Sequence, residues 1–135
     1  MASFRRDIIV RASVEDAWEA IADIGALHTR LVPGFVVATR LEPGARIVTF
    51  ANGMTLREPI VTLDAASRRL VWSSEGGRVT HYNAALQTFA EPAGGARIVW
   101  IADVLPDLLA PEIAKAMDAG AAAMKGALDR LADAG

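Results

Sequence analysis

The chain has 135 residues, of which 53% are hydrophobic and 22% charged, and its formal net charge is -2. This length and composition suit one globular domain over residues 1–135 and differ from those of a disordered chain. The slight negative charge argues against nucleic acid or an anionic membrane surface as a partner, because both select for clustered Lys and Arg. The absence of cysteine excludes disulfides, Cys-ligated zinc and thiol nucleophiles.

The sequence also argues against metal binding and membrane insertion. It contains two histidines and no closely spaced His pair, so we expect no metal site and no cofactor. The first ten residues alternate polar and apolar side chains, and no later apolar stretch reaches about 18 residues. We therefore expect neither a signal peptide nor a transmembrane helix, and a cytoplasmic location.

The N-terminal part of the chain predicts one strand followed by two helices. In residues 4–10, polar and apolar side chains alternate, as they do in a strand with one buried face. Ser13 then has an acidic residue, Asp16, three positions on, which is typical of a helix N-cap. Gly25 is a natural end for this first helix, and residues 27–31 predict a short second helix.

In the middle of the chain, apolar residues recur at every second position. This pattern predicts strands separated by turns rich in Gly, Asn and Pro. Because the connections are short, consecutive strands are expected to pair as an antiparallel meander. The six expected strands cover residues 35–42, 46–51, 55–63, 69–75, 78–90 and 97–104.

A long helix is expected at the C-terminal end. Pro111 suits its first position. Residues 118–124 are mostly small and cannot fill the space above a curved sheet. Either the sheet closes directly on the helix or a cavity remains between them, and we favour the cavity. The apolar side of this helix consists of Ile113, Met117, Gly120, Met124, Leu128 and Leu131.

Several short motifs, in this order, resemble the START-like superfamily (SRPBCC, Bet v 1-like), in its polyketide cyclase/dehydrase and lipid transport branch. The resemblance implies an α+β helix-grip fold, in which a seven-stranded antiparallel curved sheet wraps around the long C-terminal helix. It also implies a pocket that includes Glu58, in a superfold that hosts binders, carriers and enzymes alike. The motifs are SVEDAW at 13–18, LVPG at 31–34, LRE at 56–58, LD at 63–64, RRL at 68–70, HY at 81–82 and RIVW at 97–100.

The chain departs from this family pattern at two places. Leu31 stands near a position where the family often has Trp. The gating loop of the plant hormone receptors in the superfamily is shortened here to about residues 51–54. A hormone-latch mechanism is therefore not expected.

Strand alternation assigns side chains to the inner face of the sheet. A turn centred on Gly76 and Gly77 would place Trp72 opposite Tyr82 as an aromatic pair. The expected inner-face residues are Leu56, Glu58, Ile60, Leu70, Trp72, Thr80, Tyr82, Ala84, Leu86, Thr88, Ile98, Trp100, Ala102 and Val104.

Glu58 is the most informative of these residues, because a carboxylate among apolar neighbours must be paired or take up a proton. Tyr82 is one candidate partner and Arg46 the other. A three-residue loop after the preceding strand would turn Arg46 inward and diagonal to Glu58, whereas a two-residue turn would point it outward. Alternatively, Pro59 forms a bulge that swings Glu58 to solvent.

We predict a binding site for a small apolar molecule, aromatic, lipid or polyketide-like. Glu58 would orient a polar group of the ligand, with Arg46 and Tyr82 as its candidate partners. The remaining ligand-binding candidates are Phe50, Trp72, Trp100, Met117, Gly120 and Met124.

Two other functions stay open. In an enzyme, Glu58 would be the general acid/base of an aldol-type cyclisation or dehydration, and Tyr82 would donate to a developing oxyanion. A protein-interaction module would instead have a filled core. Val99 and Ile101, apolar residues on the outer face, suggest a homodimer.

The two histidines are weaker candidates. Alternation places His81 on the outer face, where we expect it to be exposed. A dyad of His81 with Asp103 is rejected because Asp103 is expected to pair with about residue 85. His28 lies near the expected pocket mouth, and a surface role is favoured for it.

Overall fold

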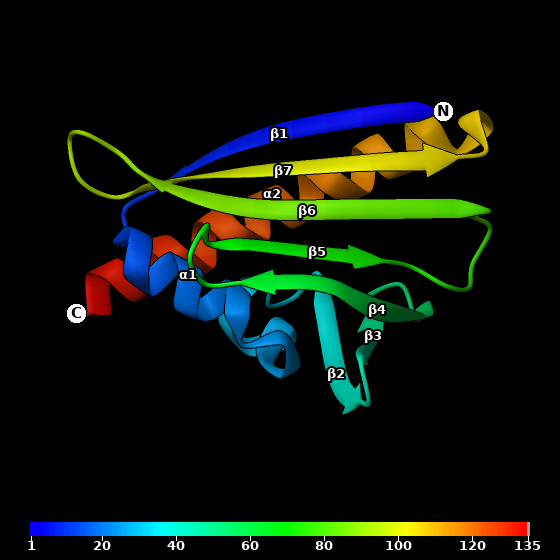
Figure 1. Ribbon diagram of the computed structural model, residues 1–135, viewed down its shortest axis with the longest axis horizontal. Helices are drawn as coiled ribbons and strands as arrows, with labels where there is room; N and C mark the ends of the chain where they lie inside the picture. Colours follow the sequence, from blue (N-terminus) through cyan, green and yellow to red (C-terminus); the bar gives the residue numbers. More distant parts are fainter. Residues whose placement is uncertain (135) are drawn as a thin grey trace.

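The structure, a computed structural model that describes residues 1–134, contains a seven-stranded antiparallel sheet with the order β1-β7-β6-β5-β4-β3-β2. Figure 1 shows it from its outer face, with the last helix behind the strands. The predicted helix-grip class is confirmed. The strands are β1 (Ala2–Val10), β2 (Val36–Glu42), β3 (Ala45–Phe50), β4 (Thr55–Asp64), β5 (Arg69–Ser73), β6 (His81–Ala90) and β7 (Ala96–Leu105).

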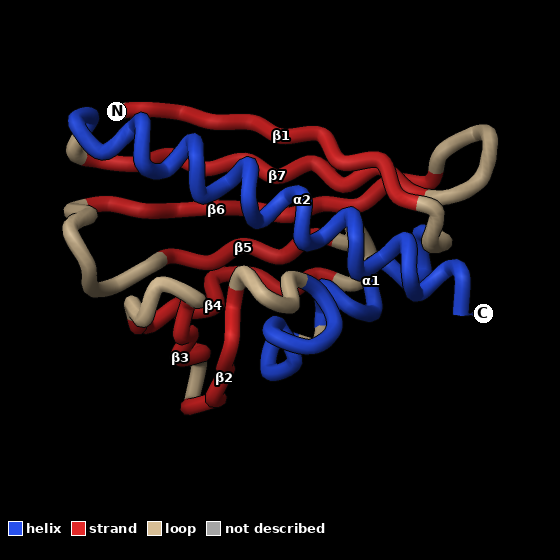
Figure 2. The backbone as a smooth tube through the Cα atoms, turned by 180° about the vertical axis from the view of Figure 1, so that it is seen from behind, coloured by secondary structure: helices blue, strands red, loops and turns tan. Residues whose placement is uncertain are grey.

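Two α-helices lie on the inner side of the sheet. Ser13 caps α1 (Val14–Ala22), because its side chain accepts a hydrogen bond of 3.1 Å from the Asp16 amide. The long helix α2 (Ala110–Ala134) crosses the inner face of the sheet obliquely (Figure 2). Short helical turns at Ile24–Ala26, Leu27–Leu31 and Asp107–Leu109 complete the chain.

The connection between β5 and β6 differs from the expected hairpin. It is a longer loop over residues 74–80, in which Gly76 and Gly77 have φ angles of +105° and +63°. Trp72 therefore pairs with Ala84, so the predicted Trp72–Tyr82 pair is wrong. Thr80 precedes β6 and is exposed, so its predicted inner-face position is wrong as well. Turn glycines alone do not define the length of the loop that contains them.

The helix and the sheet come together most closely at Gly120. A Cβ added there would lie 2.9 Å from Trp100 Cη2 and 3.2 Å from Phe35 Cε2. Glycine is needed at this position because only it allows the indole to reach the helix backbone. Farther along α2, Met124 and Leu128 are buried in the same core. The sheet thus closes on the helix here, while a cavity remains elsewhere along it.

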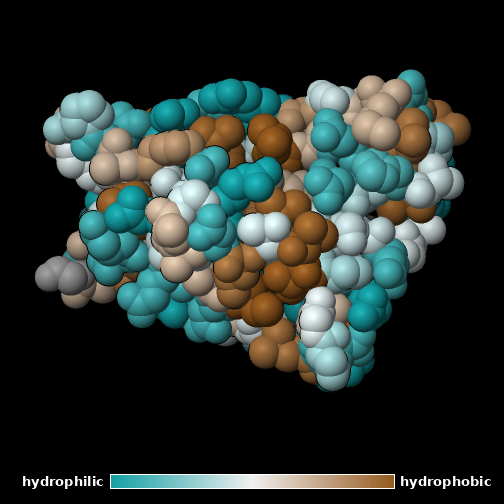
Figure 3. All heavy atoms as spheres, viewed as in Figure 1, coloured by the Kyte–Doolittle hydropathy of each residue, from teal (hydrophilic) through white to brown (hydrophobic). Residues whose placement is uncertain are grey.

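The outer face of the sheet carries apolar side chains over its middle (Figure 3). Val61 is 59% exposed and Ile101 41% exposed, whereas Val99 is half-buried. A homodimer through this face stays a prediction. Within residues 1–134, no helix is long and apolar enough to cross a membrane.

Candidate functional site

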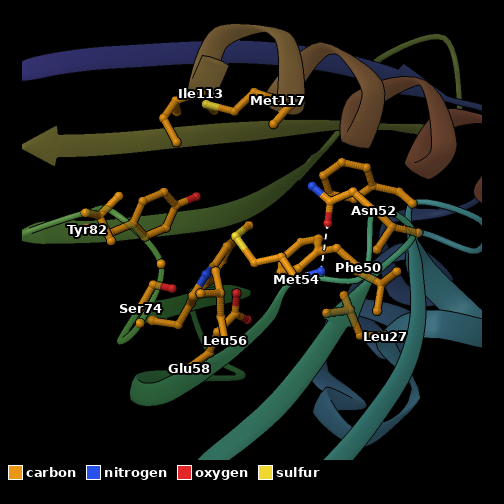
Figure 4. Close-up of a pocket in the computed structure, with 18 of the residues that line it drawn as sticks. Leu27, Phe50, Asn52, Met54, Leu56, Glu58, Ser74, Tyr82, Ile113 and Met117 are labelled. Atoms are coloured by element: carbon orange, nitrogen blue, oxygen red, sulfur yellow. Dashed lines mark hydrogen bonds between the residues drawn. The ribbon is translucent and has the colours of Figure 1, made fainter. Parts of the chain in front are cut away.

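A cavity of about 400 Å³ lies between the inner face of the sheet and the first turns of α2. Figure 4 shows side chains from α2, the sheet and the β3–β4 loop pointing into it. Most of its wall is apolar, so it favours an apolar ligand. The apolar wall includes Leu27, Leu31, Val32, Phe35, Val36, Phe50, Leu56, Trp72, Leu86, Trp100, Leu109, Ile113, Met117 and Met124.

A buried ion pair lies in this wall. Arg46 on β3 is directly opposite Glu58 on β4, and its Nε donates to Glu58 Oε1 at 2.9 Å. The two residues are only 2% and 6% exposed. A charged pair in such surroundings is held by mutual attraction and by its hydrogen bond, and neither partner can be removed without leaving a buried charge.

Loop geometry explains why Arg46 points inward. The Phe50 amide bonds to the Met54 carbonyl at 2.9 Å, which closes a three-residue loop over residues 51–53. The sequence left open whether Arg46 points inward or outward. It points inward, although it lies opposite Glu58 rather than diagonal to it. The register shift of β4 falls between Ile60 and Thr62, so the alternative of a Pro59 bulge that exposes Glu58 is wrong.

The surroundings of the pair change its titration. Burial raises the pKa of Glu58 above its ordinary range, and the charge and hydrogen bond of Arg46 oppose this rise only in part. Burial also raises the pKa of Tyr82, and the nearby Glu58 charge adds to the effect. Tyr82 therefore keeps its proton, and its hydroxyl points into the cavity (Figure 4).

Ser74 extends the ion pair into a polar row across the sheet. An antiparallel bridge between Arg57 and Glu75 places Ser74 opposite Glu58, on the side away from Arg46. The Ser74 amide bonds to the Tyr82 carbonyl at 3.3 Å. We call these four neighbours in the cavity wall the polar row: Arg46, Glu58, Ser74 and Tyr82.

Sequence reasoning missed Ser74, although a signal for it existed. Ser74 follows Trp72 by two positions and lies within the strand that was expected over 69–75, so alternation assigns both to the inner face. A serine close to a pair of turn glycines is also typical of a loop, so alternation alone does not single it out.

Several buried polar atoms around the cavity have no hydrogen-bond partner among the described residues. Three of them lie in or beside the polar row: Arg46 Nη1, Trp72 Nε1 and Ser74 Oγ. The Arg46 guanidinium also lies 5.4 Å from the centre of the Trp72 ring, in cation–π contact. Buried polar groups are nearly always paired, so these atoms mark where a ligand's polar group can bind.

The structure places the predicted ligand-binding residues at the cavity wall, with one exception. Phe50 contributes an edge-on contact with Phe35, with 5.5 Å between ring centres. The exception is Gly120, which is closed against Trp100 and does not border the cavity. The residues at the wall are Arg46, Phe50, Glu58, Trp72, Tyr82, Trp100, Met117 and Met124.

The two histidines lie away from the cavity wall. His81 is exposed and is opposite Leu105. Asp103 pairs with Asn83 rather than with residue 85, and its carboxylate accepts a hydrogen bond from Ser3 Oγ at 2.6 Å. His28 Nδ1 lies 3.1 Å from Thr39 Oγ1. Within residues 1–134, no three His, Asp or Glu side chains gather as metal ligands would.

The cavity opens beside the loop between β5 and β6. Arg78 in this loop forms an ion pair with Glu112 in the first turn of α2, with Nη1 and Oε1 2.8 Å apart. Both side chains border the cavity and are mostly exposed. Exposed Met54 contributes from the β3–β4 loop. The rim thus joins two loops and one helix end.

The comparisons with known proteins agree with this architecture. Residues 1–134 match the family described as polyketide cyclase / dehydrase and lipid transport. The chain belongs to this family. A search of the curated proteins gives no match.

Solved structures similar to this family member come from several bacteria. One from Thermobifida fusca is 26% identical, with a TM-score of 0.80, and the alignment covers 98% of this chain and 93% of that one. A START superfamily protein from Mycobacterium smegmatis is 12% identical, with a TM-score of 0.77 and coverage of 96% and 98%. The di-domain ARO/CYC BexL, of the BE-7585A biosynthetic pathway, is 19% identical with a TM-score of 0.82; 96% of this chain aligns with 47% of it.

Proposed function

We propose that this chain binds a small, largely apolar molecule in the cavity. The observation that carries the proposal is the combination of a wide apolar wall with one polar row that retains unpaired polar atoms. Ligand sites typically combine apolar walls with a few polar groups that fix orientation. The family description, which includes lipid transport, supports the same function. A filled-core interaction module is not favoured, because it has no use for a cavity of about 400 Å³.

A second candidate is an enzyme of the cyclase or dehydratase type. The raised pKa of Glu58 favours it, because a general acid/base works best when its pKa approaches the working pH. In this reaction Glu58 would move a proton at the carbon next to a carbonyl. The Tyr82 hydroxyl would donate to the oxyanion that develops. The likeness to a di-domain ARO/CYC supports this candidate.

Native mass spectrometry of the protein purified from its own host tests the binding function, followed by denaturing release of bound molecules. We expect a small apolar molecule bound in stoichiometric amount. The matched control is Trp100→Arg, which puts a charged side chain into the apolar wall and should abolish binding. If that variant, folded by circular dichroism, retains the same molecule, the cavity is not its site.

Glu58→Gln separates the two candidates once the released molecule, or its precursor, is in hand. An enzyme should lose turnover at least 100-fold while it still binds, because the amide cannot accept the proton. A binder should lose only part of its affinity. Turnover retained in Glu58→Gln would exclude the acid/base role of Glu58.

A further inference from the structure

The polar row and the adjoining Trp72 hold more unpaired hydrogen-bond donors than unpaired acceptors, all of them buried in the cavity wall. The described residues give Glu58 one hydrogen bond, from Arg46 Nε to Oε1. The unpaired atoms Arg46 Nη1 and Trp72 Nε1 can only donate, and the Ser74 hydroxyl can donate as well. A ligand group that accepts hydrogen bonds therefore fits this part of the wall better than a hydrocarbon does.

The charges of the polar row already balance each other. Arg46 and Glu58 form a pair that is almost completely buried, so the positive charge of Arg46 is directed at a carboxylate of the protein itself. A ligand carboxylate placed beside them would meet Glu58, and like charges repel strongly where the dielectric constant is low. A ligand cation would meet Arg46 in the same way. The row thus disfavours either charge.

We propose that the cavity selects an uncharged ligand whose polar end carries a hydrogen-bond acceptor, such as a ketone carbonyl. Ser74 Oγ and the free Nη1 of Arg46 bind this acceptor, and the Arg46–Glu58 pair excludes carboxylates of the same size. The inference rests on the proposed binding function and adds the chemical class of the ligand. It also assigns Ser74 as a residue that determines specificity.

The position of Ser74 supports this role. It lies between Glu58 and Tyr82 in the polar row, and its hydroxyl is buried without a partner. Thr88 on β6 provides a matched control, because its hydroxyl is also buried without a partner but does not border the cavity. A change at Thr88 therefore removes the same kind of group without touching the ligand.

The test is a calorimetric titration with three probes that share one ring system: 2-acetylnaphthalene, 2-ethylnaphthalene and 2-naphthoate, at pH 7.5. We expect the ketone to bind at least tenfold more tightly than the carboxylate and about threefold more tightly than the hydrocarbon. Ser74→Ala should weaken ketone binding about three- to tenfold and leave hydrocarbon binding unchanged. Thr88→Val should leave all three affinities unchanged.

Glu58→Gln should reverse the selection against carboxylates. The variant leaves Arg46 as the only charge of the polar row, so we expect 2-naphthoate to bind at least tenfold more tightly than it binds the wild type. Circular dichroism checks that the variant is folded. If it is not, the wild-type comparison of the three probes decides by itself.

The outcomes distinguish this inference from the function on which it rests. If none of the three probes binds the wild type although native mass spectrometry finds a bound molecule, the selection is overturned and the binding function stands; if neither experiment finds binding, both are overturned. If all three bind equally, or the carboxylate binds most tightly, the binding function stands and the selection for an uncharged acceptor is overturned. Equal loss of ketone binding in Ser74→Ala and Thr88→Val overturns the role of Ser74.

Discussion

The two ends of α2 meet the sheet in different ways. The first turns lie over the cavity, where Ile113 and Met117 form part of its wall above the polar row. The later turns are joined to β1 and the residue after it: Lys125 Nζ donates to the Ile9 carbonyl at 2.7 Å, and the Arg11 amide donates to Asp129 Oδ1 at 2.8 Å. The first turns leave room for a ligand beneath them, and the hydrogen bonds of the later turns, together with that from Arg6 Nε to Asp118 Oδ1 at 2.6 Å, fix the helix to β1.

Carboxylates near the two ends respond differently to their partners. Glu58, below the first turns, has a raised pKa because burial outweighs its pairing with Arg46. Asp129, in the later turns, has a lowered pKa because the Arg11 amide and Lys125 stabilise its charge more than burial opposes it. An ion pair therefore does not determine the direction of a pKa shift, since the loss of water competes with it.

The opposite shifts give opposite dependences of stability on pH. Because the folded state binds the Glu58 proton more tightly than the unfolded state does, this group's contribution falls as pH rises from the ordinary Glu range through its folded pKa. The contribution of Asp129 is present above its ordinary pKa and is lost as pH falls through its lowered folded value.

The largest expected effect comes from breaking the buried pair. Arg46→Met should lower the free energy of unfolding by about 3–5 kcal/mol at pH 7, because Glu58 loses its buried partner. The loss should shrink at lower pH, where Glu58 takes up a proton. Urea denaturation at pH 7 and pH 5 measures both effects.

The matched control is the double variant Arg46→Met, Glu58→Leu. Replacing the whole pair by apolar side chains should recover most of the lost stability, because no buried charge remains. A single variant within about 1 kcal/mol of the wild type would show that the pair is not desolvated as the structure indicates.

An intermediate loss of stability is expected from a change in the middle of α2, between its first turns and its later turns. Gly120→Ala should destabilise the protein by about 1–3 kcal/mol, because the added Cβ would lie 2.9 Å from Trp100 Cη2. Gly126→Ala is the matched control, since its Cβ meets only the flexible end of Arg130, and it should stabilise the helix by about 0.5–1 kcal/mol. Thermal unfolding of both variants measures the difference; equal shifts would mean that the indole can move away from Gly120.

The smallest effect is expected from the later turns of α2. Asp129→Asn should cost about 0.5–1 kcal/mol at pH 7, because it removes the charge that faces Arg11 and Lys125 while the amide oxygen can still accept a hydrogen bond. The difference from wild type should vanish as pH falls through the folded pKa of Asp129. A loss that stays constant from pH 7 to pH 3, measured by urea denaturation, would contradict this origin.

Local patterns predicted much of the candidate site. Alternation placed Glu58, Tyr82 and Trp100 on the inner face, where the structure has them. The same patterns failed at the β5–β6 connection, because a run of turn residues does not reveal how many of them the loop uses. The Trp72–Tyr82 pair was therefore wrong, and the place of Ser74 between Glu58 and Tyr82 was missed.

The sequence by itself determined the order of the elements, the face that each strand buries and the presence of a carboxylate inside, because these follow from periodicities of two and 3.6 residues. Only the tertiary structure decided which residue pairs with Glu58 and how closely α2 approaches the sheet. Strand register depends on the backbone geometry of a three-residue loop, and the distance to the helix depends on Trp100 reaching Gly120. These contacts join residues far apart in the chain, and no local pattern encodes the distance between them.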